Sequence, residues 1–123
     1  MKNAHHPAPA EISLTRVLTA LGDPIRLGLV RLLSDDRERG WGELRAPIAK
    51  STLSHHLKVL RDAGITRTRQ EGTRCYVRLR RADLDARFPG LLTTLLTAAG
   101  VDHIGADVTA VAPPPPASSP AGE

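Results

Sequence analysis

The sequence of 123 residues is poor in aromatic residues and in cysteine, on which several classes of protein depend. Its only aromatic residues are Trp41, Tyr76 and Phe88, too few for a surface that stacks bases, which argues against an RNA-recognition sheet or a single-strand-binding barrel. The single cysteine, Cys75, cannot form an internal disulfide, which fits a cytoplasmic protein. No apolar run is long enough for a signal peptide or a membrane span, so we expect no membrane partner.

The sequence also lacks the patterns that enzymes commonly show. We find no phosphate-binding loop, no pair of carboxylates flanking a cleft and no nucleophile with an accompanying base. Cys75 falls in a predicted strand, where packing explains it. We therefore expect a binding protein rather than an enzyme.

The two ends of the chain differ in composition from its middle. Residues 1–10 (MKNAHHPAPA) show no apolar periodicity, and residues 101–123 end in VAPPPPASSPAGE, whose prolines exclude a helix or a central strand. We expect both ends to be disordered tails around one folded domain at residues 11–100.

Positive charge is concentrated in one part of the chain. The formal net charge is +4, from 17 basic and 13 acidic residues, yet the segment from Lys58 to Arg81 holds eight basic residues against Asp62 and Glu71. That segment is therefore +6 and the remainder is −2. Such a concentration is expected where a protein holds phosphates.

The segment STLSHHLKVLRDAG, residues 51–64, predicts an amphipathic helix. Leu53, Leu57 and Leu60 form one apolar stripe at helical spacing. Ser51 is expected to cap the first turn and Gly64 to end the helix. His56 lies about 100° from His55 around the axis, so we expect it to pack inward as a hydrogen-bonded histidine. The opposite face carries Ser51, Ser54, His55, Lys58 and Asp62, with Arg61 at its edge.

The next segment, ITRTRQEGTRCYVRL, changes to the alternation of a β-hairpin with Glu71-Gly72 as its loop. This register places Arg69 opposite Arg74, and like charges in that position need a compensating anion, for which a phosphate backbone is the obvious candidate. The two predicted faces differ in chemistry: one carries Thr66, Thr68, Cys75, Val77 and Leu79, and the other carries Arg67, Arg69, Arg74, Tyr76 and Arg78.

The remaining elements are predicted to be helical. A helix from Glu11 to Leu21 ends at Gly22, and Asp23 and Pro24 begin a second helix that ends near Ser34. The run DDRERG, residues 35–40, is a solvated charged loop, and WGELR, residues 41–45, is a short third helix. A last helix after residue 81 is broken before residue 89, and it carries more leucines than a small core can bury, which indicates a dimer contact.

These elements predict a mainly α fold with a small β-hairpin. This is the architecture of a winged helix-turn-helix, which we expect to be homodimeric and to have disordered tails. The stretches LGDPIRLGLVRLL, STLSHHLKVLRDAGI and EGTRCYVRL together resemble the ArsR/SmtB family of bacterial repressors. The resemblance implies a homodimer on an inverted-repeat DNA operator, with the helix at Ser51 in the major groove and the hairpin as the wing. The expected DNA-binding residues are Ser51, Thr52, Ser54, His55 and Lys58 on the helix, and Arg67, Arg69, Thr73 and Arg74 on the wing.

The metal sites of the family are not matched in this chain. Both cysteine positions of the family's metal box are glycine, Gly40 and Gly42, so a soft-metal site with thiolate ligands is not expected there. Asp83 and Asp85 have no nearby histidine and are better explained as acids at a helix N-terminus. The remaining candidates for a divalent transition metal are His5, His6, Asp102 and His103, which a dimer could bring together. A resemblance of general type to nickel-responsive regulators of superoxide dismutase genes implies Ni²⁺ as that ion.

Two alternatives stay open at this point. One is a winged-helix DNA-binding regulator that responds to no effector, and the other is a winged helix used only for protein contacts. The sequence also does not determine the operator sequence, whether the protein represses or activates transcription, or whether a second protein is needed as co-regulator.

Overall fold

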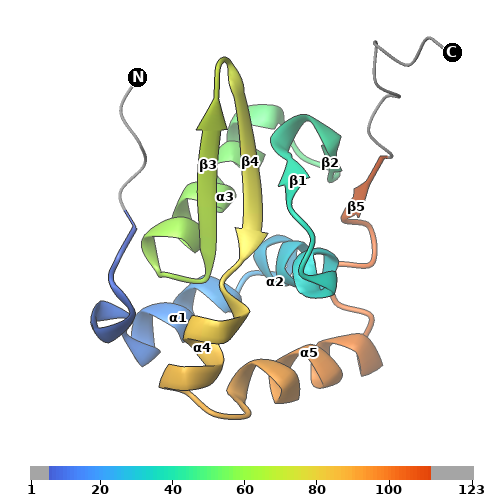
Figure 1. Ribbon diagram of the computed structural model, residues 1–123. Helices are drawn as coiled ribbons and strands as arrows, with labels where there is room; N and C mark the ends of the chain where they lie inside the picture. The colour runs from blue at the N-terminus through green and yellow to red at the C-terminus, as the bar shows by residue number, and fades with distance from the viewer. Residues whose placement is uncertain (1–5, 112–123) are drawn as a thin grey trace, which may run out of the picture.

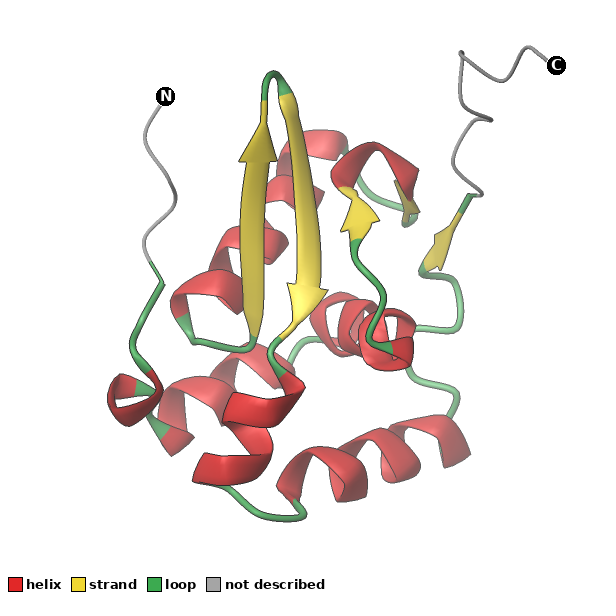
Figure 2. Cartoon of the chain, in the orientation of Figure 1, coloured by secondary structure: helices red, strands yellow, loops and turns green. Residues whose placement is uncertain are grey.

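The computed structural model describes residues 6–111, and it confirms a mainly helical fold with small antiparallel sheets, as a winged helix-turn-helix requires (Figures 1 and 2). The helices are α1 (Leu14–Leu21), α2 (Pro24–Leu32), α3 (Lys50–Asp62), α4 (Arg81–Arg87) and α5 (Leu91–Val101). The strands are β1 (Arg39–Gly40), β2 (Leu44–Arg45), β3 (Thr66–Glu71), β4 (Arg74–Leu79) and β5 (Thr109–Ala110). Three short 3₁₀ turns are η1 (Pro9–Glu11), η2 (Leu33–Asp35) and η3 (Trp41–Glu43). No helix among residues 6–111 is long and apolar enough to cross a membrane.

Helix α2 begins as its capping residues predict, whereas α1 begins at Leu14, three residues after the predicted start at Glu11, which lies in η1. The Ser13 hydroxyl accepts a hydrogen bond from Arg16 N at 3.5 Å at the start of α1, and the Asp23 carboxylate accepts one from Arg26 N at 3.0 Å at the start of α2. Pro24 occupies the first position of α2, where its missing N–H is not needed. These local signals fix the start of both helices.

Helix α3 buries its leucine stripe as predicted, with Leu53, Leu57 and Leu60 in the core. The prediction that Ser51 caps it is wrong: the helix begins at Lys50 after Ala49, and no side chain caps it. The helix ends at Asp62, and Gly64 follows with a φ of 84°. That left-handed conformation favours glycine and turns the chain into β3.

The hairpin forms, but its predicted register is wrong by two residues. Its loop is Gly72-Thr73, so that Arg69 lies opposite Tyr76 and Arg74 lies opposite Glu71. Gly72 has a φ of 61° at the first loop position, a place where a two-residue loop favours glycine. Because a shift of two residues keeps every side chain on its face, the predicted division into two faces holds, with Val77 and Leu79 buried and the arginines exposed.

The prediction of a short third helix at residues 41–45 is wrong. The segment is the single turn η3, with β1 before it and β2 after it. Gly40 and Gly42 are poor helix formers. In addition, β1 pairs with β4 and β2 pairs with β5, so the flanking residues bond to strands rather than to a helix.

The last helical segment is broken as predicted. Helix α4 ends before Phe88, whose φ of −136° is not helical, and α5 begins after Gly90. Side chains of α1, α4 and α5 pack together around Leu84, Phe88 and Leu92. This packing places α1 and α5 at the end of the molecule opposite the hairpin tip (Figure 1).

The predicted domain boundaries are wrong for part of each end of the chain. Residues 6–10 pack on the domain: the Thr68 backbone N–H donates to His6 Nε2 at 2.9 Å, and Arg80 Nη1 donates to the Pro7 carbonyl at 2.9 Å. Residues 102–111 continue past α5, bury Val108 and form β5. The tails predicted at residues 1–5 and 112–123 lie outside the described residues.

The C-terminal segment is held against α2 by a close backbone contact. A Cβ atom added to Gly105 would lie 2.2 Å from the Cα atom of Gly28, so neither position has room for a side chain. Arg31 also donates a hydrogen bond to the Ile104 carbonyl. The segment therefore runs from α5 across α2 to β2, the strand that precedes α3 in the chain.

Candidate DNA-binding interface

The exposed face of α3 carries polar side chains whose donors and acceptors are not used within residues 6–111. Ser51, Thr52, His55 and Lys58 are exposed and Ser54 is half-buried. None of them makes a hydrogen bond or a salt bridge with the described residues. Their donors, acceptors and positive charge are therefore available to a ligand. The first turn of α3 and the hairpin tip lie toward the same end of the molecule (Figure 1).

His56 packs inward as the helical wheel predicts. Its Nδ1 atom lies 3.1 Å from Arg26 Nη1 and 3.9 Å from the Asp23 carboxylate, and its side chain is 12% exposed. Since Arg26 is a donor, His56 Nδ1 accepts in this contact. Burial lowers the pKa of His56, and the nearby Asp23 carboxylate only partly opposes that effect. The two adjacent histidines thus differ: His56 joins α3 to α2, and His55 faces outward.

Arg69 on the wing is bound by carboxylates within the protein. Its Nε and Nη2 atoms donate to Glu38 at 3.0 and 2.8 Å, its Nη1 atom donates to Glu71 at 2.5 Å, and its guanidinium stacks over the Tyr76 ring at 4.5 Å. These hydrogen bonds raise the pKa of Arg69 and lower the pKa of Glu38. The predicted need for a phosphate between Arg69 and Arg74 is therefore wrong, because the two are not opposite each other and Arg69 already has its anions.

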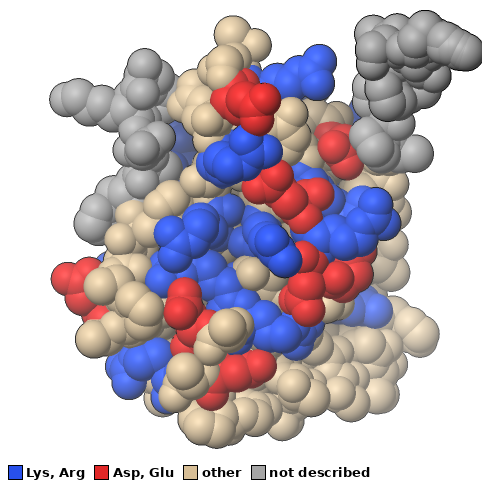
Figure 3. Space-filling view, in the orientation of Figure 1, with Lys and Arg blue, Asp and Glu red and all other residues tan. Residues whose placement is uncertain are grey.

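The other wing residues lie at two separate places. Thr73 and Arg74 are exposed at the tip, and Arg74 makes no hydrogen bond or salt bridge with the described residues. Arg67 lies near the base of the hairpin, 4.0 Å from the Asp83 carboxylate. Figure 3 shows the consequence on this face of the molecule, where basic side chains lie among acidic ones rather than in a continuous positive patch.

The sequence analysis missed the role of the acidic residues at 35–38. We interpreted that run as a solvated loop, yet Asp36 accepts a hydrogen bond from Arg81 at 2.8 Å and Glu38 binds Arg69. Asp35 accepts from Arg37 N and from Arg39, and these contacts lower its pKa. The available signal was the presence of three acids here and of four arginines on β3 and β4, but it did not specify which pairs form.

Of the predicted metal ligands, the three that lie within residues 6–111 do not come together in one chain. His5 lies outside the described residues, His6 Nε2 accepts the hydrogen bond from Thr68, and Asp102 and His103 are exposed at the end of α5, across the molecule from residue 6 (Figure 1). At the family's metal box, Glu38 is bound to Arg69 and no thiolate is present. Within residues 6–111 no group of three or more His, Cys, Asp or Glu side chains could hold a metal ion.

Comparisons with known proteins agree with this architecture. A family model described as a helix-turn-helix domain matches residues 21–69. The chain is 39% identical over 83 residues to the uncharacterized HTH-type transcriptional regulator YceK of Bacillus subtilis, a match that covers 65% of this chain and 83% of the relative. It is also 39% identical over 61 residues to an uncharacterized HTH-type transcriptional regulator of Methanocaldococcus jannaschii, covering 46% of this chain and 66% of the relative.

A solved structure supports the same assignment. It is described as a possible transcriptional regulator for arsenical resistance, and it matches with a TM-score of 0.52 and 27% identity over 73% of this chain and 97% of its own. The wing, the open face of α3 and these similarities together identify the chain as an HTH-type transcriptional regulator of the ArsR-like winged helix-turn-helix family, a family of DNA-binding proteins rather than enzymes.

Proposed function

We propose that the protein is a homodimer that binds an inverted-repeat operator, with α3 in the major groove and the wing tip on the phosphate backbone. The observation that carries the proposal is the exposed face of α3, where the side chains of Ser51, His55 and Lys58 make no hydrogen bond or salt bridge with residues 6–111. Unpartnered donors and a positive charge on one helical face suit base edges and phosphates. Thr52 adds a hydroxyl near the helix N-terminus, where backbone N–H groups also favour phosphate.

The dimer is supported by apolar side chains that one chain leaves uncovered. Leu14 and Leu18 on α1 are 43% and 44% exposed, and Val101 at the end of α5 is 73% exposed. Both helices lie at the end opposite the wing tip (Figure 1). A second copy seated on this end would leave both α3 helices free to reach successive major grooves about 34 Å apart.

The experiment compares the wild-type protein with Leu18→Glu on an inverted repeat and on a single half-site, with the operator first selected from genomic DNA. Sedimentation measures the oligomeric state, and titration measures affinity. We expect Leu18→Glu to be a monomer that binds the full repeat no better than the half-site. Thr19→Glu, an exposed substitution about 100° around α1 from Leu18, is the matched control and should remain a dimer. A wild-type monomer that binds both DNAs equally would contradict the proposal.

Regulation by a metal is a separate proposal, and it needs two subunits. Asp102 and His103 are exposed at the end of α5, next to the apolar residues of the proposed dimer contact. Oxygen and nitrogen donors suit a borderline divalent ion such as Ni²⁺. Calorimetry with Ni²⁺ tests the proposal: affinity should fall in His103→Ala and in a chain without residues 1–10, and unchanged affinity in both would remove this site.

Repression is the direction of regulation that the family resemblance implies. A promoter fused to a reporter tests it, because deletion of the regulator raises transcription under repression and lowers it under activation. Ni²⁺ supplied to the parent strain, with the deletion strain as the control, separates a nickel-responsive regulator from one that does not respond to this ion.

A further inference from the structure

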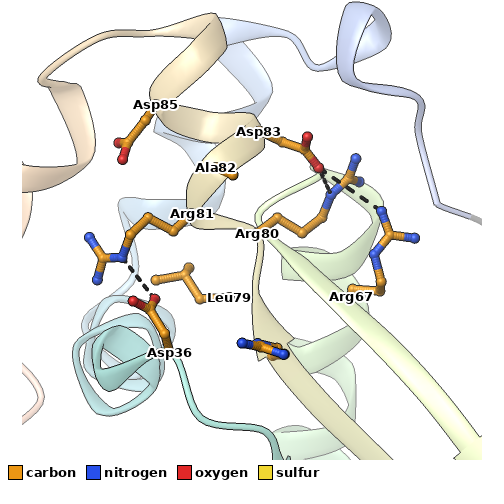
Figure 4. A pocket seen from close by; sticks show the side chains of 9 residues that line it. Asp36, Arg67, Leu79, Arg80, Arg81, Ala82, Asp83 and Asp85 are labelled. Atoms are coloured by element: carbon orange, nitrogen blue, oxygen red, sulfur yellow. Dashed lines mark hydrogen bonds and ion pairs between the residues drawn. The ribbon is translucent and has the colours of Figure 1, made fainter.

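A pocket of about 540 Å³ lies at the base of the wing, where β3 and β4 meet the start of α4 (Figure 4). It is distinct from the proposed DNA-binding face, because it lies at the opposite end of the hairpin from the tip (Figure 1). Four arginines and three aspartates line most of it: Arg67, Arg78, Arg80, Arg81, Asp36, Asp83 and Asp85.

Most of the acidic groups are neutralised by specific arginines. Asp36 accepts a hydrogen bond from Arg81 Nε at 2.8 Å, and Asp83 accepts one from Arg80 Nε at 3.0 Å (Figure 4). Asp85 lies on the Arg81 side of the pocket, away from Arg67 (Figure 4). The charges left without a partner are therefore separated in space. The negative charge of Asp85 lies on the Arg81 side of the pocket, and the positive charge lies at the end formed by β3 and β4.

That positive end contains two arginines with little compensation. Arg67 and Arg78 are directly opposite each other in the β3–β4 register, and both are exposed. Arg67 reaches the Asp83 carboxylate at 4.0 Å, and the side chain of Arg78 makes no hydrogen bond or salt bridge with residues 6–111, although the nearby Glu38 carboxylate attracts it electrostatically. Like charges directly opposite each other destabilise an antiparallel pair. An anion between them would remove the repulsion.

A third guanidinium borders the same space with an unsatisfied donor. The Arg80 side chain is only 2% exposed, and its Nη2 atom has no hydrogen-bond partner among the described residues. A buried charged group left without one of its hydrogen bonds is unusual in native proteins. Asp85 Oδ1 is also buried without a partner among the described residues, but Asp85 lies on the Arg81 side of the pocket, so the unused guanidinium donor is on the side of Arg67 (Figure 4).

We propose that the base of the wing binds a phosphate group between Arg67 and Arg78. Guanidinium groups suit phosphate because their planar arrangement of N–H donors matches its oxygen atoms. The phosphate could belong to a free small molecule or to the DNA backbone. The six-residue strands separate the pocket from the wing tip by roughly 20 Å, so we assign it to a free phosphate or phosphate ester.

The test is a titration of the full-length protein with inorganic phosphate at constant ionic strength, followed by calorimetry and by the NMR signals of the arginine side chains. We expect saturable binding that Arg67→Gln and Arg78→Gln each weaken about tenfold or more, the size expected when a charge-assisted hydrogen bond is lost. Arg74→Gln is the matched control, because Arg74 lies on the same strand and face as Arg78 but opposite Glu71. It should bind phosphate as the wild type does.

Two results would overturn the site: binding that does not saturate, or an equal loss in Arg74→Gln. Thermal melting of each variant checks that the fold persists, which we expect because the substituted side chains are exposed. This titration contains no DNA, so its failure would leave the proposed operator binding unaffected.

Repeating the titration with a saturating duplex distinguishes the two sources of phosphate. A free ligand should still bind to the DNA-bound dimer. Competition by the duplex, together with a smaller salt dependence of DNA binding in Arg78→Gln, would instead assign the pocket to the DNA backbone and overturn our choice of source.

Discussion

The recognition helix and the wing both carry polar and basic residues, but they differ in how those residues are partnered. On the exposed face of α3, His55 and Lys58 make no hydrogen bond or salt bridge with residues 6–111. On the wing, Arg69 binds two carboxylates and an aromatic ring. Positive charge in a sequence therefore marks a potential DNA contact only where the fold does not neutralise it.

This comparison divides the predicted interface into residues with different roles. The face of α3 is available to base edges, the wing tip at Arg74 is available to phosphate, and Arg69 holds the wing to the loop before β1. Substitutions in the three places should therefore change different measured quantities: specificity, salt dependence and the rigidity of the wing.

The largest effect should follow from removing a base contact on α3. If His55 reaches base edges, His55→Ala should cost about 1–3 kcal/mol on the operator, roughly 5- to 150-fold in affinity. Binding to random DNA should change little. Affinities for operator and random duplexes, measured at one salt concentration, decide the matter, and a silent substitution would remove His55 from the set of base-contacting residues. Asp62→Ala, on the same face near the far end of α3, is the control.

A smaller and uniform effect is expected at the wing tip. Arg74 is exposed and unpartnered among the described residues, so Arg74→Ala should weaken operator and random DNA alike. The slope of log affinity against log salt should fall by about one for the lost phosphate contact.

Arg69→Ala is the matched comparison on the same face of the wing. Because its guanidinium is bound by Glu38 and Glu71, we expect the salt slope to stay as in the wild type while the melting temperature falls. A reduced slope in Arg69→Ala with an unchanged slope in Arg74→Ala would reverse these two assignments.

The parts of this fold that were predicted correctly depend on local patterns. The leucine spacing of α3, the Asp23-Pro24 start of α2 and the alternation along the hairpin follow from periods of 3.6 and 2 residues and from capping chemistry. The inward position of His56 follows from the same helical geometry. Each of these inferences needs only residues within one element.

The parts that were wrong depend on contacts between distant residues. The pairing of Glu38 with Arg69 joins positions 31 residues apart, and β5 reaches β2 only after the chain has crossed α2. The hairpin register was missed because the glycine was placed second in the loop, whereas Gly72 comes first. The faces were still correct, since a shift of two residues leaves the alternation unchanged.

A still smaller effect should follow from freeing Arg69. In Glu38→Gln the bidentate carboxylate is lost, so part of the positive charge of Arg69 becomes available to phosphate. We expect slightly tighter binding to operator and random DNA alike, with a steeper salt dependence. Asp35→Asn is the control, because Asp35 bonds Arg37 N and Arg39 rather than the wing. Weaker binding in Glu38→Gln would mean that the contact serves only to hold the wing in place.

The smallest effect concerns the inward side of α3 and depends on pH. Burial lowers the pKa of His56 below its ordinary value of 6.5, so the unfolded chain binds a proton at this position more readily than the folded protein does. The stabilising contribution is complete above pH 6.5, and it is lost as the pH falls from there toward the lower folded-state pKa. The carboxyl groups of Asp35 and Glu38, whose pKa values are also lowered, act in a separate window below about 4.5.

His56→Asn keeps an acceptor near Arg26 and removes the titrating group. Chemical denaturation at pH 7.5 and at pH 5.5 should therefore show a smaller loss of stability in His56→Asn than in the wild type. His55→Asn, which changes the exposed neighbour, should retain the wild-type difference. An equal loss in all three proteins would show that His56 is not the group that titrates.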